Sequence, residues 1–163
     1  MTILREAMVG RQPGRTLVRA LVLIVASVIT FGWVLIPVRT YGDSMRPAYS
    51  AGSLNLVNRA AYLWRRPARG DVVAVRLAGL HAVYIKRIVG LPGERLAIRG
   101  GDLFINGSRF EEPYVVYRGT WEVPEMTIPQ AEYLVIGDNR SMRIEQHEFG
   151  RVKRERIAGP LVW

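Results

Sequence analysis

The stretch "AVYIKRIVG" (82–90) decides how the rest of this sequence is interpreted. Its β-branched and aromatic residues favour an extended strand. Side chains alternate along a strand, so we expect Tyr84, Lys86 and Ile88 on one face. Lys86 would then project between two large, mostly apolar neighbours. Burial there would disfavour the ammonium form and make Lys86 a candidate base, whereas an amine that snorkels to water would make it an ordinary surface lysine.

Five other segments have the same short apolar pattern, and turn-forming residues separate them. They are 53–59, 71–77, 94–100, 102–110 and 132–138. "LPGE" (91–94) predicts a tight turn, because Pro92 presets φ and Gly93 can adopt a positive φ. Asn106-Gly107 in "INGSRF" predicts a two-residue hairpin. These six short strands indicate a mainly β protein with one small antiparallel β domain.

Two segments outside these strands give weaker signals. Residues 111–129 contain three prolines and little periodicity, which favours an extension or a long loop. Residues 60–70, "AAYLWRRPARG", favour a helical turn, in which Trp64 among arginines suits a membrane surface. Neither segment predicts a second domain.

Nineteen uncharged residues, "ALVLIVASVITFGWVLIPV" (20–38), precede the predicted strands. A bilayer core of ~30 Å needs about 20 apolar residues in a helix, so this segment predicts a single transmembrane helix. Four arginines precede it and one follows directly: Arg5, Arg11, Arg15, Arg19 and Arg39. The positive-inside bias therefore predicts a cytoplasmic segment 1–19, a helix 20–38 in the cytoplasmic membrane and an extracytoplasmic β domain 39–163.

Two other interpretations of the apolar run are weaker. A cleavable secretory signal has a shorter apolar region, of about 7 to 15 residues, and a small-residue exit. This run is longer and ends in "LIPVRTYG" (35–42), which favours an uncleaved anchor. A buried soluble helix would show a polar stripe, and only Ser27 and Thr30 are polar here.

The composition restricts the chemistry. The 163-residue chain contains no cysteine, which excludes disulfides, thiolate metal ligands and a cysteine nucleophile. Its formal charge of +9 could suit nucleic acid or an anionic membrane, and the basic residues are spread along the chain. Only two of the 23 basic residues are lysines, Lys86 and Lys153. A buried lysine can lose its proton and an arginine cannot, so Lys86 is either a candidate base or a remnant of the bias towards arginine.

Ser44 lies in "YGDSMRPAYS" (41–50), a turn-forming stretch soon after the apolar run. Six residues take the chain from Val38 to Ser44, so at roughly 3.3 Å per residue Ser44 lies within about 20 Å of the predicted membrane boundary. A serine needs a base to act as a nucleophile, and the bases available are His81, His147 and a deprotonated lysine. From these residues alone, Ser44 is either a turn residue or a nucleophile.

Read in order, four segments resemble the motifs of bacterial type I signal peptidases, which are membrane-anchored Ser-Lys endopeptidases. They are "GDSMRP" (42–47), "RGDVVAV" (69–75), "YIKRIVGLPGE" (84–94) and "IGDNR" (136–140). The resemblance runs from the anchor to about Ile157. It implies an antiparallel β domain that removes signal peptides from exported preproteins, with residues 101–128 as a reduced form of the insertion that larger members carry. We expect no cofactor or metal.

The resemblance also implies roles for single residues. Ser44 is the nucleophile, its backbone N–H binds the oxyanion, and Lys86 is the general base. Gly42 stands where some members have a hydroxyl that adds a second oxyanion donor, so the second donor is unassigned. Asp138 and Arg140 would support the site through a charge-assisted pair.

The loop after the "IGDNR" segment departs from the family pattern. It reads "SMRIEQHEFG" (141–150), and an ungapped match puts Arg143 where the family has a serine that hydrogen-bonds the lysine. A cation there would lower the pKa of Lys86 but could not accept its hydrogen bond. A shift of two residues would bring Ser141 to this place, and Glu145 matches an acidic position of the family.

The preferred function is therefore signal-peptide cleavage, and two narrower alternatives stay open. One is a processing peptidase dedicated to a particular secreted or pilin-like client. The other is an impaired homologue that only binds signal peptides, which the altered loop motivates. A nucleic-acid binder, which the positive charge motivates, is excluded if the β domain is extracytoplasmic. The expected partners are preprotein signal peptides and the lipid bilayer, and the sequence does not determine the oligomeric state.

Overall fold

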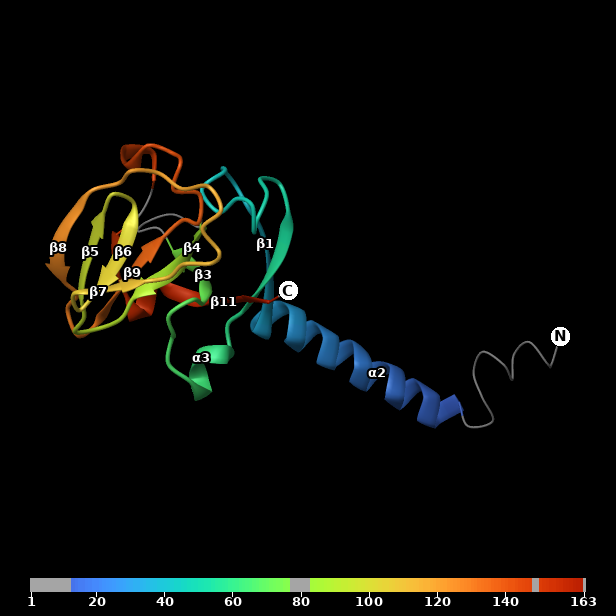
Figure 1. Cartoon of the computed structure of the whole chain (residues 1–163). Helices are drawn as coiled ribbons and strands as arrows, with labels where there is room; N and C mark the ends of the chain where they lie inside the picture. The colour runs from blue at the N-terminus through green and yellow to red at the C-terminus, as the bar shows by residue number, and fades with distance from the viewer. Residues whose placement is uncertain (1–12, 77–82, 148–149, 163) are drawn as a thin grey trace.

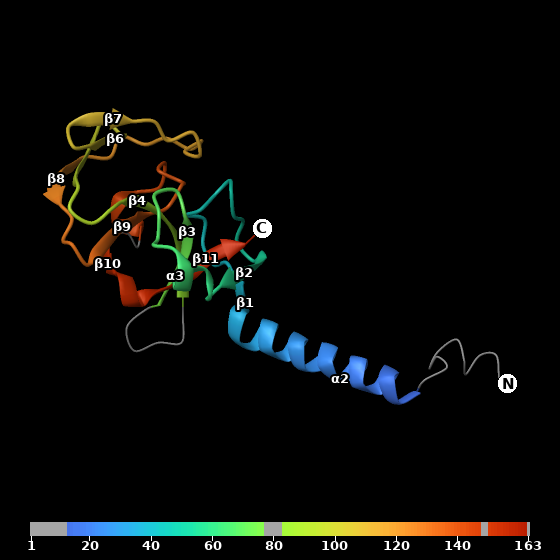
Figure 2. The same cartoon turned by 90° about the horizontal axis from the view of Figure 1, so that it is seen from below.

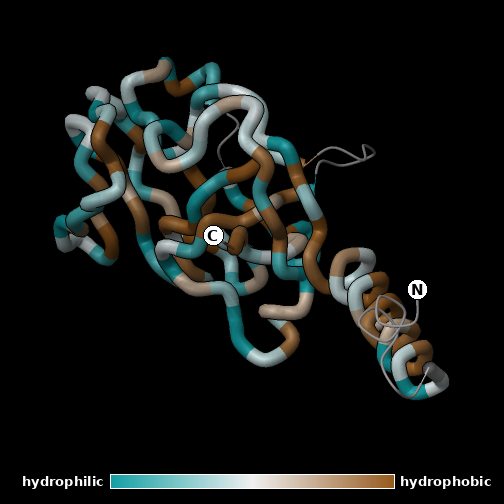
Figure 3. The backbone as a smooth tube through the Cα atoms, turned by 90° about the vertical axis from the view of Figure 1, so that its right-hand side faces the viewer, coloured by the Kyte–Doolittle hydropathy of each residue, from teal (hydrophilic) through white to brown (hydrophobic). Residues whose placement is uncertain are grey.

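The computed structural model describes residues 13–76, 83–147 and 150–162. A single long helix, α2 (Pro13–Ile29), projects away from a body of β-strands (Figure 1). It continues through a π-helical turn, Thr30–Val34, into strand β1 (Leu35–Arg39). The view from below in Figure 2 shows the same separation, so α2 covers neither sheet of the body. Apolar residues occupy most of its length in Figure 3.

The apolar helical segment begins and ends earlier than predicted. Gly14–Val34 is long and apolar enough to cross a bilayer, with a mean hydropathy of 2.2 and its side chains unburied by the rest of the protein. The predicted end of the helix is wrong, because Leu35–Arg39 form a strand. Pro37 explains the difference: it lacks an N–H and disfavours the helical conformation of the residue before it. Ten residues now lead from the helical segment to Ser44, which raises the upper limit of their separation to about 33 Å.

Two antiparallel sheets form the body. The larger has the strand order β1-β2-β11-β3-β4-β9-β10, and the smaller has the order β7-β6-β5-β8. The remaining strands are β2 (Leu54–Asn58), β3 (Val72–Arg76), β4 (Val83–Gly90), β5 (Arg95–Arg99), β6 (Asp102–Ile105), β7 (Ser108–Phe110), β8 (Val123–Thr127), β9 (Glu132–Ile136), β10 (Gly150–Lys153) and β11 (Ile157–Val162). This order places β1, which continues from the apolar helix, in the same sheet as β4, which carries Lys86.

The mainly β fold is confirmed, and all six predicted strands are present. Asn106 (φ 51°) and Gly107 (φ 84°) form the predicted hairpin between β6 and β7. Gly93 (φ 83°) forms the predicted turn between β4 and β5. Leu77 and Ala82, at the ends of two predicted strands, lie outside the described residues.

Four strands were not predicted: β1, β8, β10 and β11. β8 lies inside the predicted long loop 111–129, where Pro124 interrupts the sequence pattern that is typical of a strand. The strand still pairs because it lies at the edge of the smaller sheet, where a missing N–H donor is tolerated. β11 contains Gly159 and Pro160, which weaken its strand pattern in the same way.

The turn that carries Ser44 is anchored in the core. Met45 and Tyr49 are 1% and 4% exposed and pack in one cluster with Val72 and Ala74 of β3. The opposite face of β3 packs in a second cluster with β9 and β10, and a third cluster joins the two sheets. Burial of a side chain as large as Met45 contributes roughly 1.5 to 3 kcal/mol, so the core holds the residue next to Ser44 in place.

The predicted helical turn in 60–70 is present as α3 (Ala61–Trp64). It begins where the β1–β2 ladder ends, because Leu35 pairs with Asn58 and the amide of Arg59 donates to the carbonyl oxygen of Val34 at 2.8 Å. α3 therefore lies at the end of the ladder that adjoins the apolar helix. Ser44 follows the opposite end of β1.

Candidate active site

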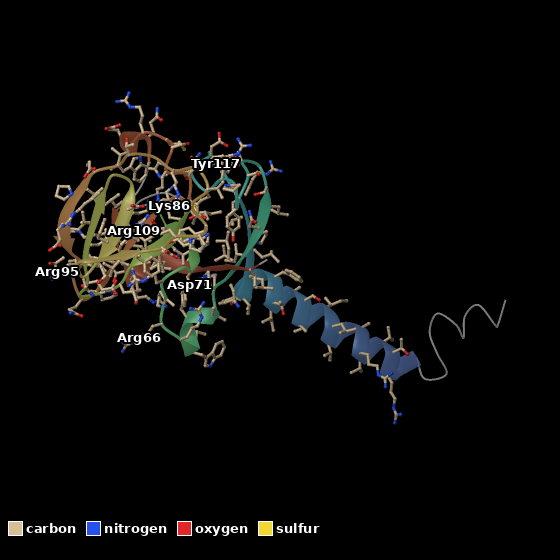
Figure 4. All side chains as sticks on the ribbon, in the orientation of Figure 1. Arg66, Asp71, Lys86, Arg95, Arg109 and Tyr117 are labelled. Carbon is tan, nitrogen blue, oxygen red and sulfur yellow. The ribbon has the colours of Figure 1, made fainter. Side chains whose placement is uncertain are left out.

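Ser44 and Lys86 come together from separate elements. Ser44 lies in the turn between β1 and β2, and Lys86 lies in the middle of β4, opposite Val73 of β3. Nζ of Lys86 is 2.6 Å from Oγ of Ser44, within hydrogen-bond distance. Lys86 is only 4% exposed, and its Nζ lies 5.6 Å from the centre of the Tyr84 ring. It lies within the outline of the body in Figure 4, and its low exposure means that Lys86 does not snorkel to the surface.

The segment after β9 holds the Ser44 turn from the other side. The backbone amide of Asn139 donates to the carbonyl oxygen of Ser44 at 2.9 Å, and its side-chain Nδ2 donates to the carbonyl oxygen of Asp43 at 3.1 Å. Gly137 permits this approach, since a Cβ at that position would lie 2.3 Å from the Ser44 carbonyl oxygen. Among the described residues, none accepts a hydrogen bond from the amide of Ser44 itself.

His147 is buried behind this segment. Its Nε2–H donates to the carbonyl oxygen of Asn139 at 2.7 Å, and its ring meets the Trp121 ring edge-on at 4.6 Å. Nδ1 has no hydrogen-bond partner among the described residues. Burial, with the nearby charge of Arg140, lowers the pKa of His147 to about 4, although the bond to Asn139 opposes the shift. The imidazole is therefore neutral at pH 7 and supports the backbone that contacts Ser44.

The predicted pair between Asp138 and Arg140 is wrong. Asp138 is fully buried and accepts two hydrogen bonds from Arg87, at 2.8 and 2.6 Å. The register explains this, because Arg87 lies opposite Ile136, two residues before Asp138. Arg140 instead pairs with buried Glu112 at 2.6 Å and donates to the backbone of the same loop. Both residues fix this loop, but through partners that the sequence did not indicate.

The side chains of Ser141, Arg143 and Glu145 in the altered loop have partners other than Lys86. Ser141 donates to Oδ1 of Asn139 at 2.7 Å, so its hydroxyl orients Asn139. Glu145 pairs with Arg143 at 3.3 Å, and both side chains are largely exposed. The cation that the ungapped match placed beside Lys86 therefore lies on the surface. The backbone carbonyl of Met142 accepts from Trp121 Nε1 at 2.9 Å, which ties the loop to the core.

A cleft of about 400 Å³ opens over the Ser44–Lys86 pair. Its lining residues are Arg39, Tyr41, Gly42, Asp43, Ser44, Val83, Tyr84, Ile85, Lys86, Met142 and Gln146. Strands β1 and β4 and the altered loop contribute to this lining, so an extended peptide could lie between them over Ser44. Within the described part of the chain, no three histidine or acidic side chains lie close enough together to bind a metal ion.

Ser44 and Lys86, the two residues predicted to react, lie together, whereas the residues that hold them in place were not predicted. His147 was considered only as a base, and the clamp by Asn139 and the ion pair from Glu112 were not predicted. Asn139 lies inside the "IGDNR" segment, which is the one signal that could have found it. The other candidate base, His81, lies outside the described residues.

A family profile described as "Signal peptidase, peptidase S26" matches residues 14–163. Among curated proteins, signal peptidase IB of Staphylococcus aureus (strain COL) is 30% identical over 156 residues, which cover 83% of this chain and 81% of that protein. A probable signal peptidase I-2 of Synechocystis is 32% identical over 123 residues, or 72% of this chain and 56% of that protein. This chain thus spans little more than half the length of the Synechocystis relative.

Among solved structures, the crystal structure of a signal peptidase I from Enterococcus faecalis V583 resembles this one with a TM-score of 0.50 and 29% sequence identity. The match covers 60% of this chain and 98% of that chain. The shared part therefore includes nearly the whole of the solved structure.

Proposed function

Since the chain belongs to the signal peptidase family, peptidase S26, we propose that it is a membrane-anchored serine endopeptidase that cleaves signal peptides from exported preproteins. The observation that carries the proposal is the 2.6 Å distance between Lys86 Nζ and Ser44 Oγ. Both residues line a cleft to which β1 and β4 also contribute. An extended peptide in this cleft would present a backbone carbonyl to the serine.

In the proposed mechanism, neutral Lys86 accepts the hydroxyl proton of Ser44 as Oγ attacks the scissile carbonyl. Burial of Lys86 supports the neutral form, because a charged amine is poorly solvated there. The backbone N–H of Ser44 stabilises the oxyanion, a contribution of about 10² to 10³ in rate per donor. The lysine then gives its proton to the leaving amine, and water hydrolyses the acyl-enzyme with Lys86 again as the base.

A histidine base has less support. His147 directs Nε2–H at the Asn139 carbonyl, and its ring packs against Trp121. A pKa of about 4 also makes it a weak proton acceptor at pH 7. His147 therefore acts on the position of the Ser44 turn in this proposal, and Lys86 acts on the proton.

The membrane anchor in this proposal is the segment Gly14–Val34. Its exposed apolar side chains require a cover, which a bilayer would supply. Arg15 and Arg19 at its start favour a cytoplasmic N-terminal side, and so an extracytoplasmic Ser44. The five residues of β1 rise about 17 Å at roughly 3.3 Å each. The cleft would thus lie close to the bilayer, where the cleavage site of a membrane-inserted signal peptide emerges.

The proposal is tested by cleavage of a preprotein with the full chain in detergent micelles. Ser44→Ala and Lys86→Ala should each abolish cleavage. Two matched controls, Ser50→Ala and Lys153→Ala, remove an exposed serine and the other, exposed lysine, and should retain it. Cleavage at the wild-type rate by Lys86→Ala would refute the lysine base.

The same preparations separate the alternatives. An unmodified protein that binds signal peptides without cleaving them would be the impaired homologue. Cleavage of one client preprotein, and of none of a panel of other preproteins, would indicate a dedicated peptidase. Protease protection of the C-terminal domain inside spheroplasts would contradict the proposed orientation.

A further inference from the structure

The turn formed by α3 exposes large apolar side chains that the proposed reaction does not use. Leu63 is 74% exposed and Trp64 is 81% exposed. Two exposed arginines, Arg65 and Arg66, follow directly. We call residues 60–66 the Trp64 turn. An aromatic and an aliphatic side chain in water beside cations are typical of segments that lie in a membrane interface.

The Trp64 turn lies at the level where the apolar helix ends. The amide of Arg59 donates to the carbonyl oxygen of Val34, the last residue of the apolar segment, at 2.8 Å. The side-chain oxygen of Asn58 then accepts from the amides of Ala60 and Ala61, both at 3.0 Å, and starts α3 at this point. Figure 1 shows α3 beside the base of α2, below the sheets. A bilayer that covers the helix up to Val34 would therefore reach the turn.

Trp64 is exposed because hydrogen bonds to Asp71 hold the Trp64 turn in a fixed conformation. Asp71 accepts hydrogen bonds from Tyr62 at 2.8 Å, from the amide of Ala68 at 3.0 Å and from two nitrogens of Arg65 at 2.7 and 3.1 Å. The Arg65 guanidinium also lies 4.9 Å from the centre of the Tyr62 ring. These bonds fix both sides of the turn, so Trp64 is directed outward by the fold.

The charge around the turn suits anionic lipid. A cleft of about 680 Å³ beside it is lined by Arg65, Arg66 and Arg154 together with Tyr62. Arg65 is neutralised by Asp71, whereas Arg66, which Figure 4 shows beside α3 on the side away from α2, has no ion pair among the described residues. A guanidinium in this place can bind a lipid phosphate while the neighbouring apolar side chains enter the acyl boundary.

We propose that the Trp64 turn is a second membrane contact, in which Leu63 and Trp64 insert into the interface of an anionic bilayer and Arg66 binds its phosphates. The proposal rests on the membrane anchor of the proposed function. A single helix lets the domain rotate about the helix axis and tilt. A second contact at the end of the β1–β2 ladder that adjoins the apolar helix removes this freedom. It also fixes the height above the bilayer of Ser44, which follows the other end of β1.

The test uses the absence of cysteine, because one introduced thiol can carry a single environment-sensitive fluorophore. Full-length Leu63→Cys is labelled and reconstituted into phosphatidylglycerol vesicles, with brominated lipid as the quencher. Val28→Cys, in the apolar helix, is the control for the anchor. Glu125→Cys, exposed in β8 at the far side of the body, is the control for water.

We expect blue-shifted emission and quenching at Leu63 and Val28, and neither effect at Glu125. A quenched Val28 probe with an unquenched Leu63 probe would overturn the second contact and leave the anchor intact. Unquenched probes at both positions would overturn the anchor, and this proposal with it. The two failures are therefore distinguishable.

Two further variants test the chemistry of the contact with the same Leu63 probe. Trp64→Ser should reduce quenching, because the main apolar side chain is lost. Arg66→Glu should reduce quenching in phosphatidylglycerol vesicles more than in phosphatidylcholine vesicles. Equal quenching of the unmodified turn in the two lipids would overturn the role of Arg66 at lipid phosphates.

Discussion

The backbone amide of Asn139 donates a hydrogen bond to the carbonyl oxygen of Ser44 at 2.9 Å, and its side chain reaches the carbonyl oxygen of Asp43. Two residues that are 95 positions apart are thereby joined at the point where the proposed nucleophile needs a fixed orientation. Lys86 approaches Ser44 from β4, so the distance between their side chains depends on two separate supports. In the proposed mechanism, Asn139 is thus a positioning residue, which acts through Ser44.

The first prediction concerns the side chain of Asn139. Asn139→Asp keeps its shape but replaces the Nδ2 donor with an oxygen that repels the Asp43 carbonyl. We expect kcat to fall by about 10²-fold, with a smaller change in KM, because a small misplacement of a reacting group is costly. Steady-state cleavage of a signal-peptide substrate measures both constants. An unchanged kcat would show that the backbone bond alone holds the turn.

Ser141 supplies the matched control. Its hydroxyl donates to the Asn139 side chain at 2.7 Å from an exposed position. Ser141→Ala should therefore lower kcat much less than Asn139→Asp. A loss as large as that of Lys86→Ala would mean that Ser141 contacts the lysine, as the family pattern implies.

The sequence predicted the parts of this site that are local. Lys86 could be placed on a strand face because strand periodicity is a short-range property, and the four motifs then supplied Ser44 as its partner. The partners of Asp138 and Arg140 could not be predicted, since they depend on the β4–β9 register and on the position of Glu112 in a loop. Such pairs form between distant segments and leave no spacing in the sequence.

The second prediction concerns the buried ion pair of Arg140 and Glu112, whose side chains are 1% and 5% exposed. Glu112→Gln leaves a buried guanidinium without its counter-charge, which typically costs about 3 to 5 kcal/mol. Urea unfolding of the full chain in micelles should show this loss. Glu145→Gln, which breaks an exposed pair, should change stability by less than about 1 kcal/mol. Equal effects of the two substitutions would contradict the assigned role of Glu112.

The third prediction is a pH dependence that arises from His147. Its pKa is about 4 in the folded protein and 6.5 in the unfolded chain, so the unfolded chain binds more protons between these values. The contribution is fully present above pH 6.5 and is lost as the pH falls towards 4. A shift of this size corresponds to roughly 3 kcal/mol.

Urea unfolding at several pH values between 4 and 7 measures this contribution. His147→Gln is the appropriate comparison, because it can still donate to the Asn139 carbonyl but does not titrate. The variant should lose less stability over this interval than the unmodified protein. Parallel pH curves for the two proteins would assign the dependence to other groups.

The fourth prediction concerns the close approach of Gly137 to Ser44. A Cβ in Gly137→Ala would lie 2.3 Å from the Ser44 carbonyl oxygen and 2.7 Å from the His147 ring, so the Ser44 turn must move. We expect kcat to fall by about 10²-fold and stability to fall by about 1 to 3 kcal/mol.

Gly159→Ala is a control with the same clash elsewhere, because its Cβ would lie 2.3 Å from the Asn58 carbonyl oxygen, in β2. It should lose similar stability yet keep kcat, since β11 does not contact the Ser44 turn through this residue. The ratio of the two kcat values separates displacement of Ser44 from general destabilisation. If both variants lost activity equally, the position of the Ser44 carbonyl would not control the reaction, and the support by Asn139 and His147 would be structural only.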